Sequence, residues 1–229
     1  MAAVVVAAVA GALLGRFMRP VLADNGAPMG RAPVPEVVTA ALFAVAAWRL
    51  DGWPLVAVLV LMATLAVLSI VDLVDYRLPD AVLFPGTAAG AAVLVVGELV
   101  DGAAANLAAA AVGAVVYFVI LLVMHLVSPA GMGFGDVKLA VLLGMYVGWA
   151  AGTRLDAVRG VMMALLVGSL LGVILGVGRI AAVRLGARFL PDPEEGSAGP
   201  GWHRTTFPFG PPLMIGALAV VLFPTTFLG

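Results

Sequence analysis

The sequence predicts an all-α membrane protein, a polytopic bundle of about eight transmembrane helices. Apolar residues make up 63% of the 229 residues, and the mean hydropathy is +1.16. Charged residues make up only 11%, against about 25% in soluble domains, which is too few to cover a surface that faces water. The apolar residues are also collected in runs, and a helix needs about 20 mostly apolar residues to cross a bilayer.

Eight apolar runs, separated by charged, Pro-rich or Gly-rich breaks, are candidate spans. In chain order they cover residues 2–14, 34–48, 54–73, 81–97, 103–127, 137–151, 157–183 and 211–227. The first run has no basic residue before it and is followed by Arg16 and Arg19, the reverse of the charge order in a signal peptide. We therefore expect it to be retained as the first helix. Pro85 falls inside the fourth run, where we expect a kink.

Between the seventh and eighth runs lies a polar stretch, residues 191–206. It is rich in Pro, Gly and acidic residues and has no periodic apolar pattern, so we expect a linker with no chemistry of its own. No internal repeat is visible. We therefore expect residues 1–229 to form a single membrane domain.

The basic residues indicate an orientation, because cytoplasmic loops retain Lys and Arg. Three of them, Arg49, Arg154 and Arg159, fall in one set of alternate loops. The other set holds the remaining nine: Arg16, Arg19, Arg31, Arg77, Lys138, Arg179, Arg184, Arg188 and Arg204. The loops after the first, third, fifth and seventh helices are therefore expected in the cytoplasm, with both termini outside.

Two acids stand at helix ends on the predicted cytoplasmic side. Asp72 ends the third run, and Asp136 opens the sixth. Two carboxyl groups a few ångströms apart share one proton near neutral pH. The ionised member can then take a proton from water while the protonated member donates a hydrogen bond to a scissile carbonyl. Taken singly, Asp136 could equally be a helix N-cap, and Asp72 could pair with Arg77.

Glycines precede the second acid, at Gly131, Gly133 and Gly135. They permit positive φ and close approach of a substrate main chain. The sequence has no cysteine, which excludes a disulfide framework, a Cys-ligated zinc and a thiol nucleophile. Its two histidines make a poor metal site, and we expect His125 to be a hydrogen-bonded packing residue. No metal or cofactor is expected.

Three segments carry a family resemblance. These are G-M-G-F-G-D-V-K at 131–138, D-L-V-D-Y-R-L-P-D at 72–80 and F-P-F-G-P-P-L at 207–213. In these segments, and in their order, the chain resembles the prepilin peptidases, or type IV leader peptidases, within the wider class of G-x-G-D aspartyl proteases.

The resemblance implies the catalytic pair and the reaction. The catalytic acids are Asp72 and Asp136, and Asp75 is a neighbour. The chain would remove the short basic leader from type IV pilin-like precursors at the cytoplasmic face of the bacterial plasma membrane. Supporting positions implied by the motifs, for the substrate groove or the motif itself, are Gly131, Gly133, Gly135, Lys138, Pro79, Phe209, Gly210 and Pro211.

One segment departs from the family pattern. Longer relatives carry a cytoplasmic segment after the first helix, with cysteine pairs that resemble a zinc site and a linked N-methyltransferase activity. Here that loop is only about residues 16–33, and cysteine is absent. The resemblance therefore extends to the peptidase, and we do not expect the methyltransferase or its need for S-adenosylmethionine.

Two other functions compete with a peptidase. Paired intramembrane acids also mark ion paths in transporters, but transporter sites lie near the midplane, whereas these acids lie at helix ends. Ion flux in proteoliposomes that is lost on Asp72→Asn would favour a transporter. The other alternative, a catalytically silent scaffold of a pilus or secretion machine, has no need for both acids.

Overall fold

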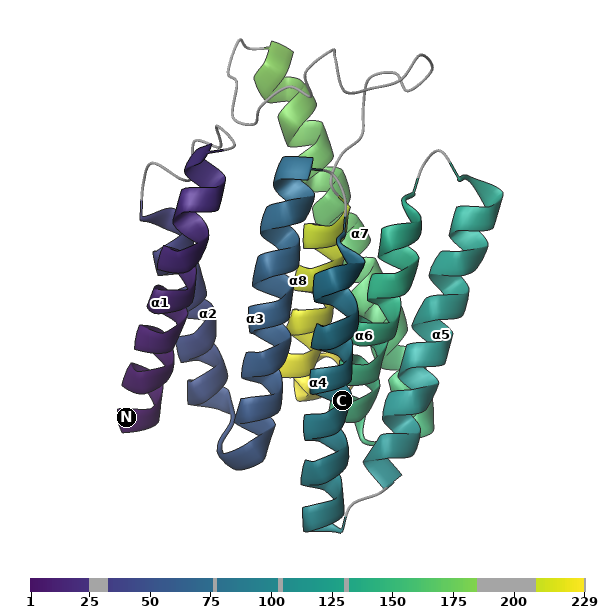
Figure 1. The fold of residues 1–229 in the computed structure, drawn as a ribbon. Coiled ribbons are helices and arrows are strands. Elements are labelled where there is room, and N and C mark those ends of the chain that lie inside the picture. The colour runs from purple at the N-terminus through teal and green to yellow at the C-terminus, as the bar shows by residue number, and fades with distance from the viewer. Residues whose placement is uncertain (25–32, 76–77, 103–104, 130–131, 185–208, 229) are drawn as a thin grey trace.

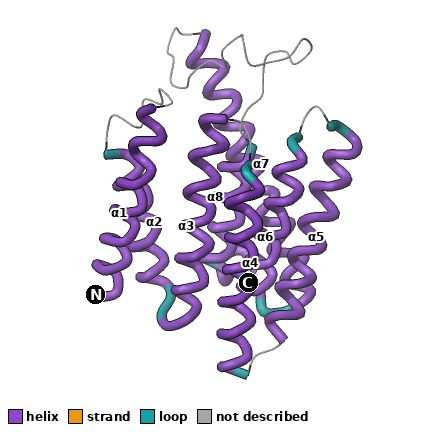
Figure 2. Tube along the Cα trace, viewed as in Figure 1, coloured by secondary structure: helices purple, strands orange, loops and turns teal. Residues whose placement is uncertain are grey.

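The computed structural model describes residues 1–24, 33–75, 78–102, 105–129, 132–184 and 209–228. All regular secondary structure in these ranges is helical (Figure 2). In chain order the helices are α1 Ala2–Asp24, α2 Val34–Arg49, α3 Gly52–Asp75, α4 Asp80–Asp101, α5 Ala105–Val127, α6 Phe134–Ala151, α7 Arg154–Arg184, α8 Gly210–Leu222 and α9 Pro224–Leu228 (Figure 1). The predicted linker at 191–206 lies outside the described residues.

Six helices of the described chain, α1 and α3 to α7, are long and apolar enough to cross a membrane. The other two predicted spans are shorter: α2 has 16 residues and α8 has 13, against the about 20 that a full span needs. The predicted class, an all-α polytopic membrane protein, is confirmed, with six full-length helices and two shorter ones.

Two predicted boundaries are wrong. The first helix does not end at residue 14 but continues through Arg16 and Arg19 to Asp24, because arginine ends an apolar run without ending a helix. The eighth predicted run, 211–227, is not one helix: α8 ends at Leu222 and α9 starts at Pro224. Proline lacks an N–H and restricts the residue before it, which explains the break at Phe223. The other boundaries agree within a few residues.

Helices α5 to α8 pack as one tight unit. The contact between α5 and α6 is the most extensive in the described chain, and α7 and α8 also pack closely. Backbones touch at glycines: a Cβ on Gly144 of α6 would collide with the Gly113 carbonyl of α5, and a Cβ on Gly216 of α8 would collide with the Ala164 carbonyl of α7. Such small-residue contacts bring helices close together in membranes. We call α5 to α8 the glycine-packed unit.

The α3–α4 hairpin meets this unit less extensively, and it does so through side chains. A Cβ on Gly90 of α4 would lie 2.8 Å from the Tyr146 hydroxyl of α6. That hydroxyl donates a hydrogen bond of 2.8 Å to the Ala57 carbonyl of α3. Side chains can change rotamer where backbones cannot, so this interface is the more adaptable of the two.

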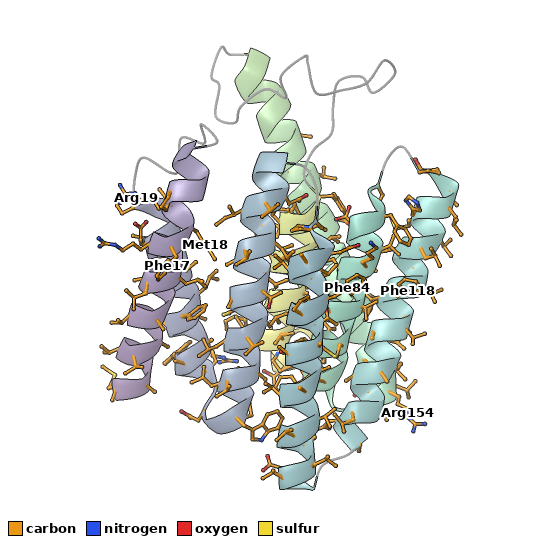
Figure 3. All side chains as sticks on the ribbon, in the orientation of Figure 1. Phe17, Met18, Arg19, Phe84, Phe118 and Arg154 are labelled. Atoms are coloured by element: carbon orange, nitrogen blue, oxygen red, sulfur yellow. The ribbon has the colours of Figure 1, made fainter. Side chains whose placement is uncertain are left out.

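The end of α3 and the start of α6 lie at the same end of the bundle, the upper end in Figure 1. Arg19 lies toward this end of α1, whereas Arg154 begins α7 at the opposite end (Figure 3). Asp72 and Asp136 therefore share one end of the molecule, although 64 positions separate them in the sequence.

Candidate active site

Asp72 lies in the last turn of α3, after a long apolar run. The residue is only 7% exposed, and its Oδ2 atom has no hydrogen-bond partner among the described residues. It faces the backbone of Gly210 at the start of α8, where a Cβ would come within 2.7 Å of Oδ2. A buried carboxyl oxygen without a partner is unfavourable for stability, which makes Asp72 a candidate functional group.

Asp136 is the third residue of α6, and it is 8% exposed. The sixth helix begins at Phe134, slightly earlier than predicted, so Asp136 lies inside the first turn. The N-cap residue is Gly133, and no side chain caps this helix. The alternative reading of Asp136 as the N-cap is therefore wrong. Its N–H donates to the Gly133 carbonyl at 3.2 Å, and a carboxylate is well placed near a helix N-terminus.

The two carboxyl groups are buried at the same end of the bundle, where Asp72 is 7% and Asp136 is 8% exposed. The segments that follow and precede the acids touch, because a Cβ on Gly135 would lie 3.1 Å from the Cβ of Leu78. Two acids from separate helices are thus buried beside segments in contact, and carboxyl groups that meet in such surroundings hold a single proton between them.

The motif glycines are not explained by positive φ. Among the described residues, positive φ occurs at Gly52, Gly102 and Gly152, and Gly133 has φ −68° and ψ 145°. Gly133 and Gly135 therefore do not use the positive φ that glycine permits. At Gly135 the small side chain leaves room for Leu78, and Gly133 is exposed. Gly131 lies outside the described residues.

The remaining motif residues occupy helix starts. Pro79 is the N-cap residue of α4, and Phe209 is the N-cap residue of α8. The Phe209 ring packs on α7, where a Cβ on Gly172 would lie 2.8 Å from it. Gly210 and Pro211 then form the first turn of α8. The third motif thus sets the beginning of α8 beside Asp72.

Lys138 has a partner that the sequence did not disclose. Its Nζ donates hydrogen bonds of 2.8 and 2.7 Å to the two carboxylate oxygens of Asp80, the first residue of α4. The ring centroids of Phe84 and Phe134 lie 5.6 and 5.5 Å from Nζ. Asp80 thus serves as an ion-pair partner from the first turn of α4. The only hint in the sequence is that Lys138 is the single lysine.

Sequence reasoning also missed a buried acid at the opposite end of the bundle. Glu98 of α4 is 2% exposed, and its carboxylate accepts hydrogen bonds from Asn106 at 3.1 and 3.0 Å and from the Trp149 indole at 2.6 Å. Its immediate neighbours in the sequence are apolar and form no motif with it. Its buried position becomes evident only in the fold. Its hydrogen bonds tie α4 to α6.

The described residues contain no cluster of three or more His, Cys, Asp or Glu side chains that could hold a metal. His125 packs as expected: its Nδ1 lies 2.9 Å from the Met132 carbonyl, and its ring lies 5.5 Å from that of Phe134. The His125 ring thereby joins the end of α5 to the start of α6. His203 lies outside the described residues.

Comparison with known proteins identifies the family. The model of the type IV leader peptidase family matches residues 59–177, which is more than half of the chain. This range includes both acids and the segments around them.

Several curated relatives are similar to the same region. Prepilin leader peptidase/N-methyltransferases of Aeromonas salmonicida (strain A449) and Pseudomonas putida are each 33% identical, over 156 and 200 residues. These matches cover 66% and 84% of this chain but 49% and 59% of the relatives. The chain thus spans about half the length of the curated relatives it matches. No solved structure is detectably similar. From the family match and these relatives, we conclude that the chain belongs to the type IV leader peptidase family.

Proposed function

We propose that this chain is an intramembrane aspartic endopeptidase that removes the short basic leader from type IV prepilin-like precursors. The observation that carries the proposal is the pair of buried acids, Asp72 at the end of α3 and Asp136 at the start of α6, at the same end of the bundle. The two lie on the two segments that resemble the family's motifs. Family membership and the printed names of the relatives support prepilin-like substrates.

The chemistry needs only the two carboxyl groups and water. The ionised acid takes a proton from water as the water oxygen attacks the scissile carbonyl carbon, and the protonated acid donates a hydrogen bond to the carbonyl oxygen. The C–N bond then breaks as the departing amine receives a proton from the pair. Products are a carboxylic acid and an amine, and no metal, cofactor or covalent intermediate takes part.

The supporting residues have separate tasks in this proposal. Gly133, which is exposed, leaves space for an extended substrate main chain before Asp136. The same role is proposed for Gly131 from its place in the motif. Gly135 admits Leu78, while Pro79 starts α4. On the Asp72 side, the segment Phe209, Gly210 and Pro211 sets the start of α8 against the carboxyl group.

We further propose that the site faces the cytoplasm of a bacterial plasma membrane, with both termini outside. The distribution of basic residues supports this, since Arg19 and Lys138 lie at the end that holds the acids and Arg154 lies at the other (Figure 3). The leader of a pilin-like precursor would then meet the acids where its apolar helix enters the membrane. Only a short segment separates α1, which ends at Asp24, from α2, which starts at Val34, and cysteine is absent. We therefore propose the peptidase without the N-methyltransferase.

The test is cleavage by the purified chain in proteoliposomes that contain a pilin-like precursor, with products identified by mass spectrometry. We expect a single cut between the basic leader and the apolar helix. Asp72→Asn and Asp136→Asn should each abolish it, and Asp75→Asn should be milder. The backbone of Asp75 ends α3, and its side chain lies outside the described residues. Full activity in either of the first two variants would overturn the proposal.

A further inference from the structure

Lys138 does not face Asp136, even though only one residue separates them. On an α-helix, residues two positions apart point to different sides, whereas neighbours on one face are three or four apart. Lys138 instead reaches Asp80 of α4 with two short hydrogen bonds, 2.8 and 2.7 Å. The main contact of Lys138 is therefore with Asp80 and not with the Asp136 carboxyl.

The pair joins the two catalytic segments. Asp80 follows Asp72 on the chain by eight positions, and Lys138 follows Asp136 by two. Leu78 makes a second contact between the same segments, because it packs on Gly135. A Cβ added to Gly135 would lie 3.1 Å from the Cβ of Leu78. The segment after α3 is thus fixed to the first turn of α6 at two points.

The surroundings strengthen the ion pair. Exposed ion pairs contribute little because water and salt screen them. Here the Lys138 side chain is 28% exposed and that of Asp80 is 50% exposed, and the ammonium also lies over the aromatic rings of Phe84 and Phe134, which favour a cation. Phe84 lies in the upper half of α4 (Figure 3). The pair is therefore more than a contact between two solvated charges.

A catalytic pair on two separate helices needs such a restraint. The two acids can share one proton only while the end of α3 stays near the start of α6, and α3 has no backbone-to-backbone glycine contact with α6 among the described residues. We propose that the Asp80–Lys138 ion pair is a positioning clamp that holds Asp72 within reach of Asp136. The inference rests on the proposed peptidase function.

The first test is a double-mutant cycle on cleavage. Asp80→Asn and Lys138→Met each break the pair. Each should lower kcat about tenfold while KM changes less than about twofold, because a clamp acts on the position of Asp72 and not on substrate binding. The kcat of the double variant should be no lower than that of the less active single variant. Lys138→Arg should retain most of the activity. A raised KM with unchanged kcat, or losses that multiply in the double variant, would overturn the clamp.

A second readout does not depend on cleavage. The chain has no cysteine, and the Ser69 hydroxyl of α3 lies 3.0 Å from the Met214 sulfur of α8. Ser69→Cys with Met214→Cys places two thiols on facing positions of α3 and α8. Because cysteine is shorter than methionine, a disulfide needs close approach of the two helices, so its rate of formation under mild oxidation reports how closely α3 stays docked. Adding Asp80→Asn or Lys138→Met should slow the reaction several-fold. An unchanged rate in both would contradict the clamp even if the protein cleaves no precursor.

The matched control is another ion pair of the same chain. Arg159 and Asp156 of α7 are 3.0 Å apart and lie at the opposite end of the bundle. Asp156→Asn with Arg159→Met should leave kcat and the disulfide rate unchanged. If the Ser69→Cys, Met214→Cys protein shows the dependence on Asp80 and Lys138 but wild-type protein shows no cleavage, the proposed function fails and the clamp stands. If it cleaves and neither clamp variant affects kcat, the clamp fails and the proposed function stands.

Discussion

The two catalytic candidates belong to parts of the molecule that are held together in different ways. Asp136 lies on α6, inside the glycine-packed unit, where helix backbones touch at Gly113 and Gly144. Asp72 lies on α3, which meets the rest through side chains such as Ser69 on Met214. One acid is therefore on a rigid frame and the other on an adaptable element. We expect α3 to be the element that moves when a peptide enters.

The largest effect is expected inside the glycine-packed unit. A Cβ in Gly144→Ala would collide with the Gly113 carbonyl, a backbone atom that cannot rotate away. Overpacking of this kind costs about 3 kcal/mol or more, so the variant should melt far below wild type or fail to accumulate. The matched control is Gly176→Ala on α7, where nothing lies within 4 Å of the new Cβ. Equal melting temperatures for the two variants would contradict the distinction between the regions.

A methyl group at the junction of the two regions should affect cleavage more than stability. In Gly210→Ala the new Cβ would lie 2.7 Å from Oδ2 of Asp72, and the carboxyl group must turn away. Displacement of a catalytic group by about 1 Å can lower the rate about 100-fold, and we expect that loss in kcat/KM. Melting should stay near wild type, because a side chain rather than a backbone yields. A variant that cleaves normally would show that the position of Asp72 is not critical.

Glu98→Gln tests the one buried carboxylate that ties the adaptable α4 to α6. The new amide group would bring an N–H against the donors of Asn106 or Trp149 and remove at least one of the three hydrogen bonds that the carboxylate accepts. We expect a loss of about 2 kcal/mol in the free energy of unfolding, measured by thermal melting. Cleavage at permissive temperature should persist. Asp101→Asn, at an exposed acid that accepts a hydrogen bond from Trp53, is the control and should change stability little.

The smallest effect is expected within the α3–α4 hairpin. Gly86→Ala would bring a Cβ against the Thr64 side chain, which can shift or be shortened. We expect a loss of about 1 kcal/mol. Adding Thr64→Ala should restore most of it in a thermal melt. No such rescue is available at Gly144, where the obstacle is a backbone atom. If Thr64→Ala does not restore the stability of Gly86→Ala, the contrast between side-chain and backbone interfaces is contradicted.

Much of this architecture was predictable, because apolar runs and their breaks report the membrane directly. The run before Asp72 and the start of the run after Asp136 located both acids at helix ends. The same signal failed at α1, since hydropathy marks the membrane edge and Arg16 and Arg19 lie in a helix that continues past it. It failed at α8 because Pro224 interrupts a helix without interrupting an apolar run.

The contacts between distant segments could not be predicted from periodicity. Nothing near Asp80 or Lys138 in the sequence indicates that they pair, because 58 positions separate them and tertiary packing alone brings them together. Glu98 is hidden for the same reason. By contrast, the segment with Gly210 was singled out by resemblance, and its contact with Asp72 gives that resemblance a physical basis.

The central claim is that two acids, one on the adaptable α3 and one on the rigid α6, act as one catalytic unit. The most direct measurement is the cleavage rate of Asp72→Asn, Asp136→Asn and the double variant in proteoliposomes, each confirmed as folded by its melting temperature. Groups that act as a unit give non-additive losses, so each single variant should lose as much activity as the double. Losses that multiply, or substantial cleavage with either acid removed, would contradict the account.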